Sequence, residues 1–309
     1  MSRMATLKYK IKAEEVGRRI DYIVQKLTER SKSQVRGLFD HNCVSHNQQS
    51  CNDAGVLLMM DDEITIQYDQ SQNYKEKSRA YQSSIFSLVF EDEHLLIIDK
   101  KAGFLTVPND HRDSQTVVSA LSEYLSHGQK KRRMVSIVHR LDRDTSGLLV
   151  FAKNDKVAQQ IKAQFEKRKP QREYLAIVAG HLKSPKGTFQ NFLTTDKNLN
   201  QHSTDDEGEG KLAITHYQTK QVLKDTTYVS VTLETGRRNQ IRVHFAEIGH
   251  PVLGDVRYET ARAHHARWKA KRLALHAALL GFTHPVTGKE LLFRSKTPVE
   301  FEVFVKGQG

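Results

Sequence analysis

The arrangement of strand-like and helix-like segments predicts an α+β protein with two unequal domains. The chain has 309 residues, of which 38% are hydrophobic, and this is enough to form a substantial core. Residues 69–84 contain few apolar side chains and show no periodicity, which is typical of a linker. Beyond them, strands and helices follow one another without strict alternation, so we expect a mixed or antiparallel sheet. We therefore place a small α/β domain at residues 1–70, a linker at 71–84 and a larger α+β domain at 85–309.

The first domain is expected to contain two helices and a small sheet. Apolar residues at the spacing i, i+3, i+4 and i+7 indicate a helix with one apolar face. They are Ile20, Ile23, Val24 and Leu27. Either Ser31 or Ser33 can cap a second helix, whose buried residues would be Val35, Leu38 and Phe39. Short strands are expected at Val44 and over residues 56–68, where Ile64, Ile66 and Tyr68 alternate.

The larger domain is expected to begin with a hairpin, because residues 86–90 and 95–99 indicate strands around a polar turn. A helix should run from about Thr116 to a cap at Gly128. Another should start at Asn154 or Asp155. Further strands are expected at residues 135–138, 148–152, 174–178 and 228–233. This order of elements is the basis of the α+β prediction.

The most informative segment is a polar loop between two of the predicted strands. Its sequence is His139-Arg140-Leu141-Asp142-Arg143-Asp144-Thr145-Ser146-Gly147, and an apolar run follows it. A rigid scaffold usually carries its chemistry on such connections, so the loop is suited to present the carboxylate of Asp142. The alternative is a solvated turn in which Arg143 and Asp144 pair at the surface.

A second informative segment, residues 233–244, predicts a strand that turns at Gly236 and enters a helix. Asn239 is a suitable N-cap for this helix. Its core face would be formed by Ile241, Phe245 and Ile248. Arg242 falls in the first turn, where free backbone N–H groups and a guanidinium together favour an anion. Asp142 is the natural candidate for that anion.

These segments resemble motifs of the RluA-type pseudouridine synthases. The loop at Asp142 matches H-R-L-D-x-x-T-S-G, and residues 235–244 resemble T-G-R-x-H-Q-I-R-x-H, with Asn239 in place of a histidine. Residues 172–180 resemble K-x-Y-x-A-x-V-x-G, with Arg172 in place of lysine. Gly249 together with residues 250–258 matches the continuation G-x-P-x-x-G-D-x-x-Y, and residues 272–298 resemble the closing segment. The resemblance extends over about residues 85–304.

The resemblance implies a role for each of several residues. Asp142 would be the catalytic residue, Arg242 would pair with it, and Tyr174 would stack on the uracil as a proposed proton acceptor. Leu275 would pack against the base, and Arg140 would insert into the RNA where the base leaves. Arg237 and Arg172, at basic positions of the motifs, are expected to bind RNA. Arg18-Arg19-Ile20-Asp21 resembles the R-x-D opening of the alpha-L RNA-binding domain found in a ribosomal small-subunit protein and at the front of many RluA-type enzymes.

These residue types suit the isomerisation of uridine to pseudouridine. The reaction breaks the N-glycosidic bond, turns the base over and joins its carbon to the same sugar carbon, with no net redox change. A carboxylate can stabilise or trap the cationic character that appears on the sugar. Attack on the ribose, elimination to a glycal and addition to the base all stay open for Asp142. Because a stacked base cannot react, the nucleotide must be extruded at a cost of about a few kcal/mol.

Charge and composition indicate the class of partner. The net charge is +12 with a pI of about 9.5, and residues 1–75 hold 11 Lys and Arg against 10 Asp and Glu, so nearly all the excess lies beyond them. This favours nucleic acid, with basic runs at 130–133, 167–169 and 262–272 able to contact phosphates. By family habit, an alpha-L front domain favours large-subunit ribosomal RNA as the partner, with transfer RNA as the alternative. We expect a monomer.

Other sequence features bear on location, cofactors and rival functions. No apolar segment is typical of a signal peptide or a membrane span, so we expect a cytoplasmic protein. Cys43 and Cys51 lack C-x-x-C spacing and no H-E-x-x-H motif occurs, so no metal or other cofactor is expected. One rival function is a non-catalytic RNA-binding or ribosome assembly factor. Another is a nucleoside or glycan hydrolase that uses Asp142 together with Asp144.

Overall fold

The computed structural model describes residues 4–51, 53–72, 74, 83–109, 115–126, 133–197 and 200–307. The chain divides into two compact units, Met1–Ala80 and Tyr81–Gly309. Most of the expected linker, the expected helix end at Gly128 and the basic residues 130–132 lie outside the described residues. Among the residues that are described, no helix combines the length and apolar character needed to cross a bilayer.

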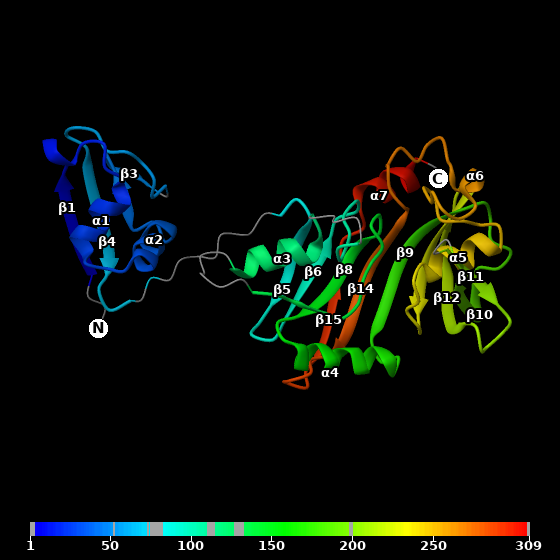
Figure 1. Cartoon of the computed structure of the whole chain (residues 1–309). Helices are drawn as coiled ribbons and strands as arrows, with labels where there is room; N and C mark the ends of the chain where they lie inside the picture. The colour runs from blue at the N-terminus through cyan, green and yellow to red at the C-terminus, as the bar shows by residue number, and fades with distance from the viewer. Residues whose placement is uncertain are drawn as a thin grey trace. The chain divides into compact units, whose positions relative to one another are not determined.

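The N-terminal unit is a small antiparallel sheet on which two helices pack (Figure 1). Its strands are β1 (Met4–Lys10), β2 (Val44–His46), β3 (Gln49–Ser50) and β4 (Glu63–Asp69), in the order β1-β4-β2-β3. The helices are α1 (Ile20–Thr28) and α2 (Lys32–Asp40), after a 3-10 turn at Ala13–Glu15. The core includes Ile20, Ile23 and Val24 of α1 and Val35, Leu38 and Phe39 of α2, which confirms the predicted apolar faces.

Three local features of this unit refine or correct the predictions. Ser31 is the cap of α2, because its side chain accepts a hydrogen bond from the backbone N–H of Gln34 at 3.3 Å. The strand expected from residue 56 begins only at Glu63, because the Asp62 carboxylate accepts a bond from the Met59 N–H and turns the chain there. Strand β1 was not predicted, although it pairs with β4 over its whole length.

The larger unit is built on one mixed sheet, which confirms the α+β class. Among the described residues the strand order is β11-β10-β12-β13-β9-β14-β8-β6-β5, with β15 on β14 and β7 on β8. The first strands are β5 (Phe86–Glu91), β6 (Leu95–Lys100), β7 (Ser136–Ile137), β8 (Ser146–Ala152) and β9 (Gln171–Ala179). The others are β10 (Lys186–Thr195), β11 (Gln201–Thr204), β12 (Lys211–Val222), β13 (Thr226–Leu233), β14 (Leu275–Thr283) and β15 (Glu290–Arg294).

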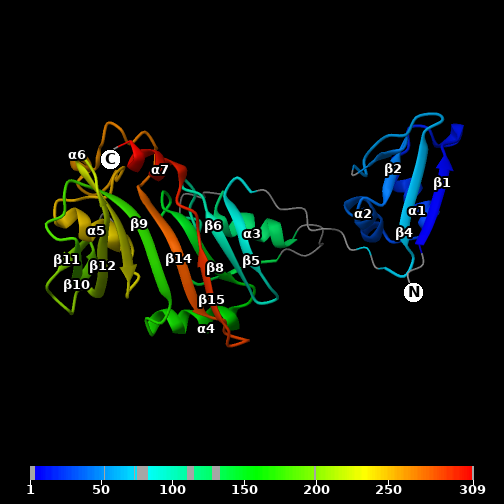
Figure 2. The same ribbon diagram turned by 180° about the vertical axis from the view of Figure 1, so that it is seen from behind.

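Helices cover both faces of the central strands. They are α3 (Val117–Ser126), α4 (Asp155–Glu166), α5 (Gln240–Glu247), α6 (Thr260–Ala263) and α7 (Val299–Lys306). Strand β8 is buried throughout: Leu149 and Phe151 join the core shared with α3, α5 and α7, while Leu148 and Val150 join the core shared with α4. Asn154 caps α4 through a bond from the Val157 N–H at 2.9 Å. Figure 2 shows β9 and β14, which pair in antiparallel fashion, at the middle of this sheet.

Two contacts place the loop of Asp142 at the centre of this unit. Strands β8 and β14 are parallel and touch only at their beginnings, where Ser146 pairs with His276 and Gly147 with Ala277. A Cβ atom on Gly147 would lie 2.2 Å from the Ala277 carbonyl oxygen, and its φ is +113°, so only glycine fits. The motif glycine therefore allows the strand that follows Asp142 to lie directly against the strand that begins at Leu275.

Helix α5 departs from its predicted pattern. Ile241 and Phe245 are buried as expected, but Ile248 is 45% exposed. The helix ends at Glu247, so Ile248 lies beyond the last turn and turns outward. Residues 240–246 are all buried, which means that this helix has no solvated face from which an amphipathic pattern could arise.

Candidate active site

The loop that carries Asp142 is anchored at both ends. Before it, His139 Nε2 accepts a bond from the Val150 N–H at 3.2 Å, and its ring lies 4.9 Å from that of Phe165. Within it, the buried hydroxyl of Thr106 donates to the Leu141 carbonyl at 2.8 Å and accepts from the Leu141 N–H at 3.2 Å. After it, the Thr145 N–H bonds to the Asp142 carbonyl at 3.2 Å. The backbone on either side of Asp142 is therefore fixed.

Lys100, at the end of β6, is a second anchor that sequence reasoning missed. Its side chain is fully buried, and Nζ donates to the carbonyls of Lys101 (3.0 Å), Phe104 (2.8 Å) and Arg143 (2.8 Å). Burial lowers the pKa of Lys100 to about 7, although the nearby carboxylate of Asp144 acts in the opposite direction. The available signal was a lysine at the last position of the apolar strand 95–100, where a buried charge must find partners.

Arg242 joins the loop to helix α5. Its Nη1 donates to Asp142 Oδ2 at 3.0 Å and to Asn239 Oδ1 at 3.2 Å. On the other edge of the guanidinium, Nε and Nη2 donate to the two oxygens of Asp255 at 2.7 and 2.8 Å. Arg242 is 9% exposed and the Asp255 side chain is 0% exposed. The guanidinium thus bridges a buried carboxylate and the more accessible one of Asp142.

The carboxylates of Asp255 and Asp142 keep Arg242 positively charged. Burial acts to lower the pKa of Arg242, but the hydrogen bonds and negative charge of Asp255, together with Asp142, outweigh burial and raise it. Asp255 is itself held by the backbone N–H groups of Arg257 and Tyr258, at 2.8 and 3.1 Å. The ring of Tyr258 lies 5.1 Å from the guanidinium carbon, close enough for a cation–π contact.

Asn239 precedes α5 as predicted, but it does not cap the helix with its side chain. Its backbone is left-handed (φ +53°), and no capping bond forms. Instead Oδ1 accepts from Arg242, and Nδ2 donates to the Tyr258 hydroxyl at 2.9 Å. That hydroxyl also accepts the Gln201 N–H at 3.1 Å, which ties this network to β11. The side chain therefore positions the guanidinium rather than the helix start.

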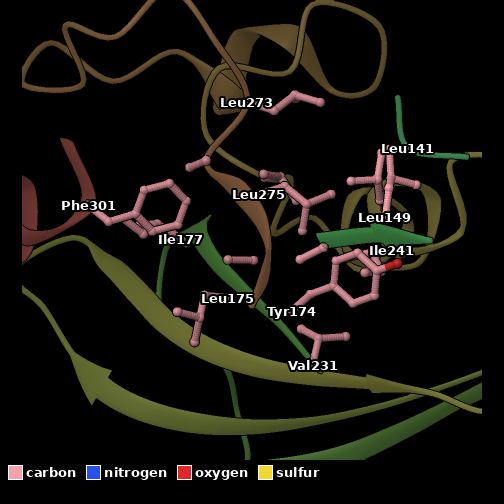
Figure 3. Packing of buried hydrophobic residues seen from close by; sticks show 14 of the residues in the cluster. Leu141, Leu149, Tyr174, Leu175, Ile177, Val231, Ile241, Leu273, Leu275 and Phe301 are labelled. Atoms are coloured by element: carbon pink, nitrogen blue, oxygen red, sulfur yellow. The ribbon is translucent and has the colours of Figure 1, made fainter. Parts of the chain in front are cut away.

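An open pocket lies in front of the Asp142 carboxylate. Its lining residues are Arg140, Leu141, Asp142, Thr145, Tyr174, Leu233, Arg237, Asn239, Gln240, Ile241, Arg242 and Leu275. Tyr174 comes from β9, between β13 and β14, and is largely buried. Burial raises its pKa, so the phenol is protonated at neutral pH. Figure 3 shows its ring near Ile241 and Leu275, two apolar residues that also line the pocket.

Of the seven predicted site residues, the structure brings six to this pocket. Arg237 lines it while its Nε donates to the Leu212 carbonyl at 2.9 Å. Arg172 does not line it: this side chain is 7% exposed, and its Nη2 donates to the carbonyls of Leu233 (3.3 Å) and Glu234 (2.9 Å). Arg172 thus holds the end of β13, from which the chain leads to α5.

The geometry suits chemistry at a flat, polar base joined to a sugar. One carboxylate faces the opening, a fixed cation orients it, and an aromatic ring and a leucine form a surface on which a base can lie. In the described part of the chain, no cluster of three or more His, Cys, Asp or Glu side chains is arranged to hold a metal ion.

Comparisons with known proteins agree with this geometry. The sequence model of the RNA pseudouridylate synthase family matches residues 94–247. Ribosomal large subunit pseudouridine synthase D of Zymomonas mobilis is 34% identical, and the alignment covers 98% of this chain and 98% of that protein. Dual-specificity RNA pseudouridine synthase RluA of Haemophilus influenzae is 35% identical over 68% of this chain and 92% of its own length.

A solved structure shares the fold. Human RNA Pseudouridylate Synthase Domain Containing 4 superimposes with a TM-score of 0.57 at 24% identity, covering 71% of this chain and 91% of that one. Together, the motifs, the full-length similarity and the family match place this chain in the RluA-type family of RNA pseudouridine synthases.

Proposed function

We propose that this RNA pseudouridine synthase modifies uridines in large-subunit ribosomal RNA, with Asp142 as the reacting carboxylate. The observation that carries the residue assignment is the bond from Arg242 to Asp142 at the mouth of the pocket, with Asp255 on the other side of the guanidinium. The relative from Zymomonas mobilis, which matches over nearly its whole length, carries the large-subunit name and supports the choice of RNA.

The residues around Asp142 have different roles in this proposal. Arg242 keeps the carboxylate in one orientation, so that it meets the sugar or the base without first reorganising. Tyr174 and Leu275 hold the detached uracil while it turns, and the neutral phenol of Tyr174 provides a hydroxyl beside it. Arg140 is exposed at the rim, where it can occupy the space that the extruded nucleotide leaves.

The N-terminal unit is assigned to RNA binding. A groove of this unit is lined by Arg18, Arg19, Lys32 and Arg36 of the α1–α2 region together with Tyr22. The Arg18 guanidinium lies 4.8 Å from the exposed ring of Tyr22, an arrangement that can meet both a phosphate and a base. This unit contributes affinity for the polymer and the larger unit contributes the chemistry.

The assignment of Asp142 is tested by comparing Asp142→Asn with Asp144→Asn. Formation of the carbon–carbon bond displaces hydrogen from the uracil carbon, so tritium placed there is released at each turnover. We expect Asp142→Asn to release none while binding RNA within several-fold of the wild type. Asp144→Asn should remain active. If both variants are inactive and the wild type produces hydrolysed nucleoside, the paired-carboxylate hydrolase would be favoured. Turnover by Asp142→Asn would refute the proposed role of Asp142.

Transfer RNA is the second candidate substrate, because the sequence motifs do not specify the class of RNA and the similar protein from Haemophilus influenzae is named a dual-specificity RNA pseudouridine synthase. Mapping pseudouridines in total RNA from a strain that lacks this gene, against its parent, distinguishes the two. Sites lost only from large-subunit ribosomal RNA would support the proposal, and sites lost only from transfer RNA would overturn it. Restoration of normal growth by Asp142→Asn would favour a separate assembly role.

A further inference from the structure

A second pocket of the larger unit lies behind the catalytic loop. Its volume is about 590 Å³, within the range of sites that hold small ligands. Its lining adjoins that of the candidate active site along the chain, because Thr145 and Leu275 line the active site while Ser146 and His276 line this pocket. Ser146, four residues after Asp142, lines it, and Arg272 in its wall donates from Nη2 to the carbonyl of Leu275, which lines the first pocket.

The lining is strongly cationic. Lys100, Lys101, Lys271, Arg272 and Lys296 contribute five basic side chains, against the two acidic side chains of Asp99 and Glu300. These acids, together with the nearby carboxylate of Asp144, offset part of this charge. Burial raises the pKa of Asp99, whose carboxylate accepts the Ser295 hydroxyl, and Glu300 is 46% exposed with its oxygen 3.9 Å from Arg272 Nη1.

The buried floor of the pocket is organised around Arg272. Its Nε donates to the Leu273 carbonyl at 3.1 Å, and Nη2 donates to Ser146 Oγ at 2.6 Å. The Ser146 hydroxyl is in turn 2.7 Å from His276 Nδ1. Nη1 is the edge that points towards Glu300, at a separation longer than a hydrogen bond. The guanidinium is thus fixed on one side and able to donate on the other.

Burial disfavours the charged forms of the basic groups on this floor. Burial lowers the pKa of Arg272, and burial followed by the charge of Arg272 lowers that of Lys100 to about 7. Burial and the same arginine lower the pKa of His276 to about 4. An oxyanion bound at this place would favour the protonated forms of Lys100 and Arg272, as the nearby carboxylates of Asp144, Glu300 and Asp99 already do in part.

We propose that this pocket binds a phosphate group of the RNA chain that carries the target uridine, through Arg272, Lys271 and Lys296. The inference rests on the proposed function in that it takes RNA as the polymer. A phosphate held here contacts the back of the loop that carries Asp142 and the start of β14 that carries Leu275. Binding of the RNA is thereby coupled to the placement of Asp142 and Leu275.

The test compares two double variants of the full chain that lose the same charge. Lys271→Gln with Lys296→Gln removes two exposed lysines of the pocket. Lys156→Gln with Lys289→Gln, the matched control, removes two exposed lysines from α4 and the β14–β15 turn. These lie beyond the ends of β8 and β14 that are opposite to Ser146 and Leu275. Affinity is measured for an unmodified large-subunit ribosomal RNA transcript as the salt concentration is varied.

Each phosphate contact contributes about 0.7 to 0.9 to the slope of log affinity against log salt. Over a fourfold rise in salt, the wild type should therefore lose about 2.5- to 3.5-fold more affinity than the pocket variant, and the control should resemble the wild type. Equal slopes for the two double variants would overturn the proposal, because only overall charge would then matter. An unchanged slope in the pocket variant would overturn it too.

A second experiment distinguishes binding of an RNA phosphate from binding of a free phosphate compound. Calorimetric titration with inorganic phosphate is performed on the wild type and the pocket variant. Saturable binding that the variant loses, together with an unchanged RNA slope, would assign the pocket to a free phosphate compound and refute the RNA proposal. A reduced slope supports the proposal whatever the phosphate titration gives. Because the slope is a binding measurement, it holds even if the modified uridine proves to lie in another RNA.

Discussion

Replacing Asp255 with asparagine tests whether its buried carboxylate positions that of Asp142, the proposed catalytic residue. Asp255 accepts two of the four hydrogen bonds that Arg242 makes to side chains, at 2.7 and 2.8 Å, and its side chain is inaccessible to solvent. Asparagine keeps the shape and one acceptor, but it removes the charge and places an NH2 group against the guanidinium. Arg242 then keeps Asp142 as its carboxylate partner, the bond to Asn239 and one bond to the oxygen of the new asparagine.

The magnitude follows from the burial of the pair. Removing one partner of a buried ion pair costs about 3–5 kcal/mol, and asparagine should lie near the lower figure because one bond survives. About 3 kcal/mol corresponds to a fall in Tm of roughly 6–12 °C for a unit of this size. A misplaced Arg242 also releases Asp142 from its single charge-assisted bond. We expect the single-turnover rate to fall by about 10- to 100-fold.

The assay is tritium release under single-turnover conditions at saturating enzyme, well below the Tm of the variant. Thermal unfolding and RNA affinity are measured on the same samples. Asp155→Asn, at the exposed start of α4, is a matched control and should change neither the Tm nor the single-turnover rate much. A variant at Asp255 with lowered Tm and a rate within twofold of the wild type would limit this residue to a structural role. An unchanged Tm would show that the pair carries no net stability.

Three further results are expected. Asn239→Gly, which suits the left-handed backbone at φ +53°, should slow single turnover several-fold by freeing Arg242 and Tyr258 while hardly changing Tm; an unchanged rate would show that the network is dispensable. Lys100 loses its proton near pH 7 when folded but near its ordinary value of 10.5 when unfolded, so between these two pH values unfolding should be accompanied by uptake of a proton by Lys100. The stability of the wild type relative to Lys100→Met should therefore rise with pH above about 7, by at most about 1.4 kcal/mol per unit, and denaturant titrations that show no such slope would contradict the lowered pKa. Deleting residues 1–80 should leave a folded unit that is active on short RNA at high concentration but weaker on long RNA, whereas a folded but inactive product would show that the first unit shapes the active site.

Much of the local structure followed from the sequence because it depends on neighbours along the chain. The faces of α1 and α2, the cap of α4 at Asn154 and the hairpin of β5 and β6 are set by short-range spacing and hydrogen bonding. Where such rules were wrong, a tertiary contact outweighed them. Asn239 is chemically a good cap, yet the guanidinium of Arg242 takes its side-chain oxygen. Ile248 fits the helical period, yet α5 ends before it.

The sequence by itself determined the α+β class, the motif residues and the family, and these include Asp142, Tyr174 and Arg242. Only the tertiary structure decided which side chains support them. Arg242 and Asp142 are 100 residues apart in the chain, and Asp255 and Lys100 act on them from other segments. Such long-range partners leave no periodic trace, because a buried charge can be satisfied by any segment that the fold brings near. Arg172 is a further example. Its position in the motif predicts RNA binding, whereas in the fold its side chain donates to the backbone at the end of β13.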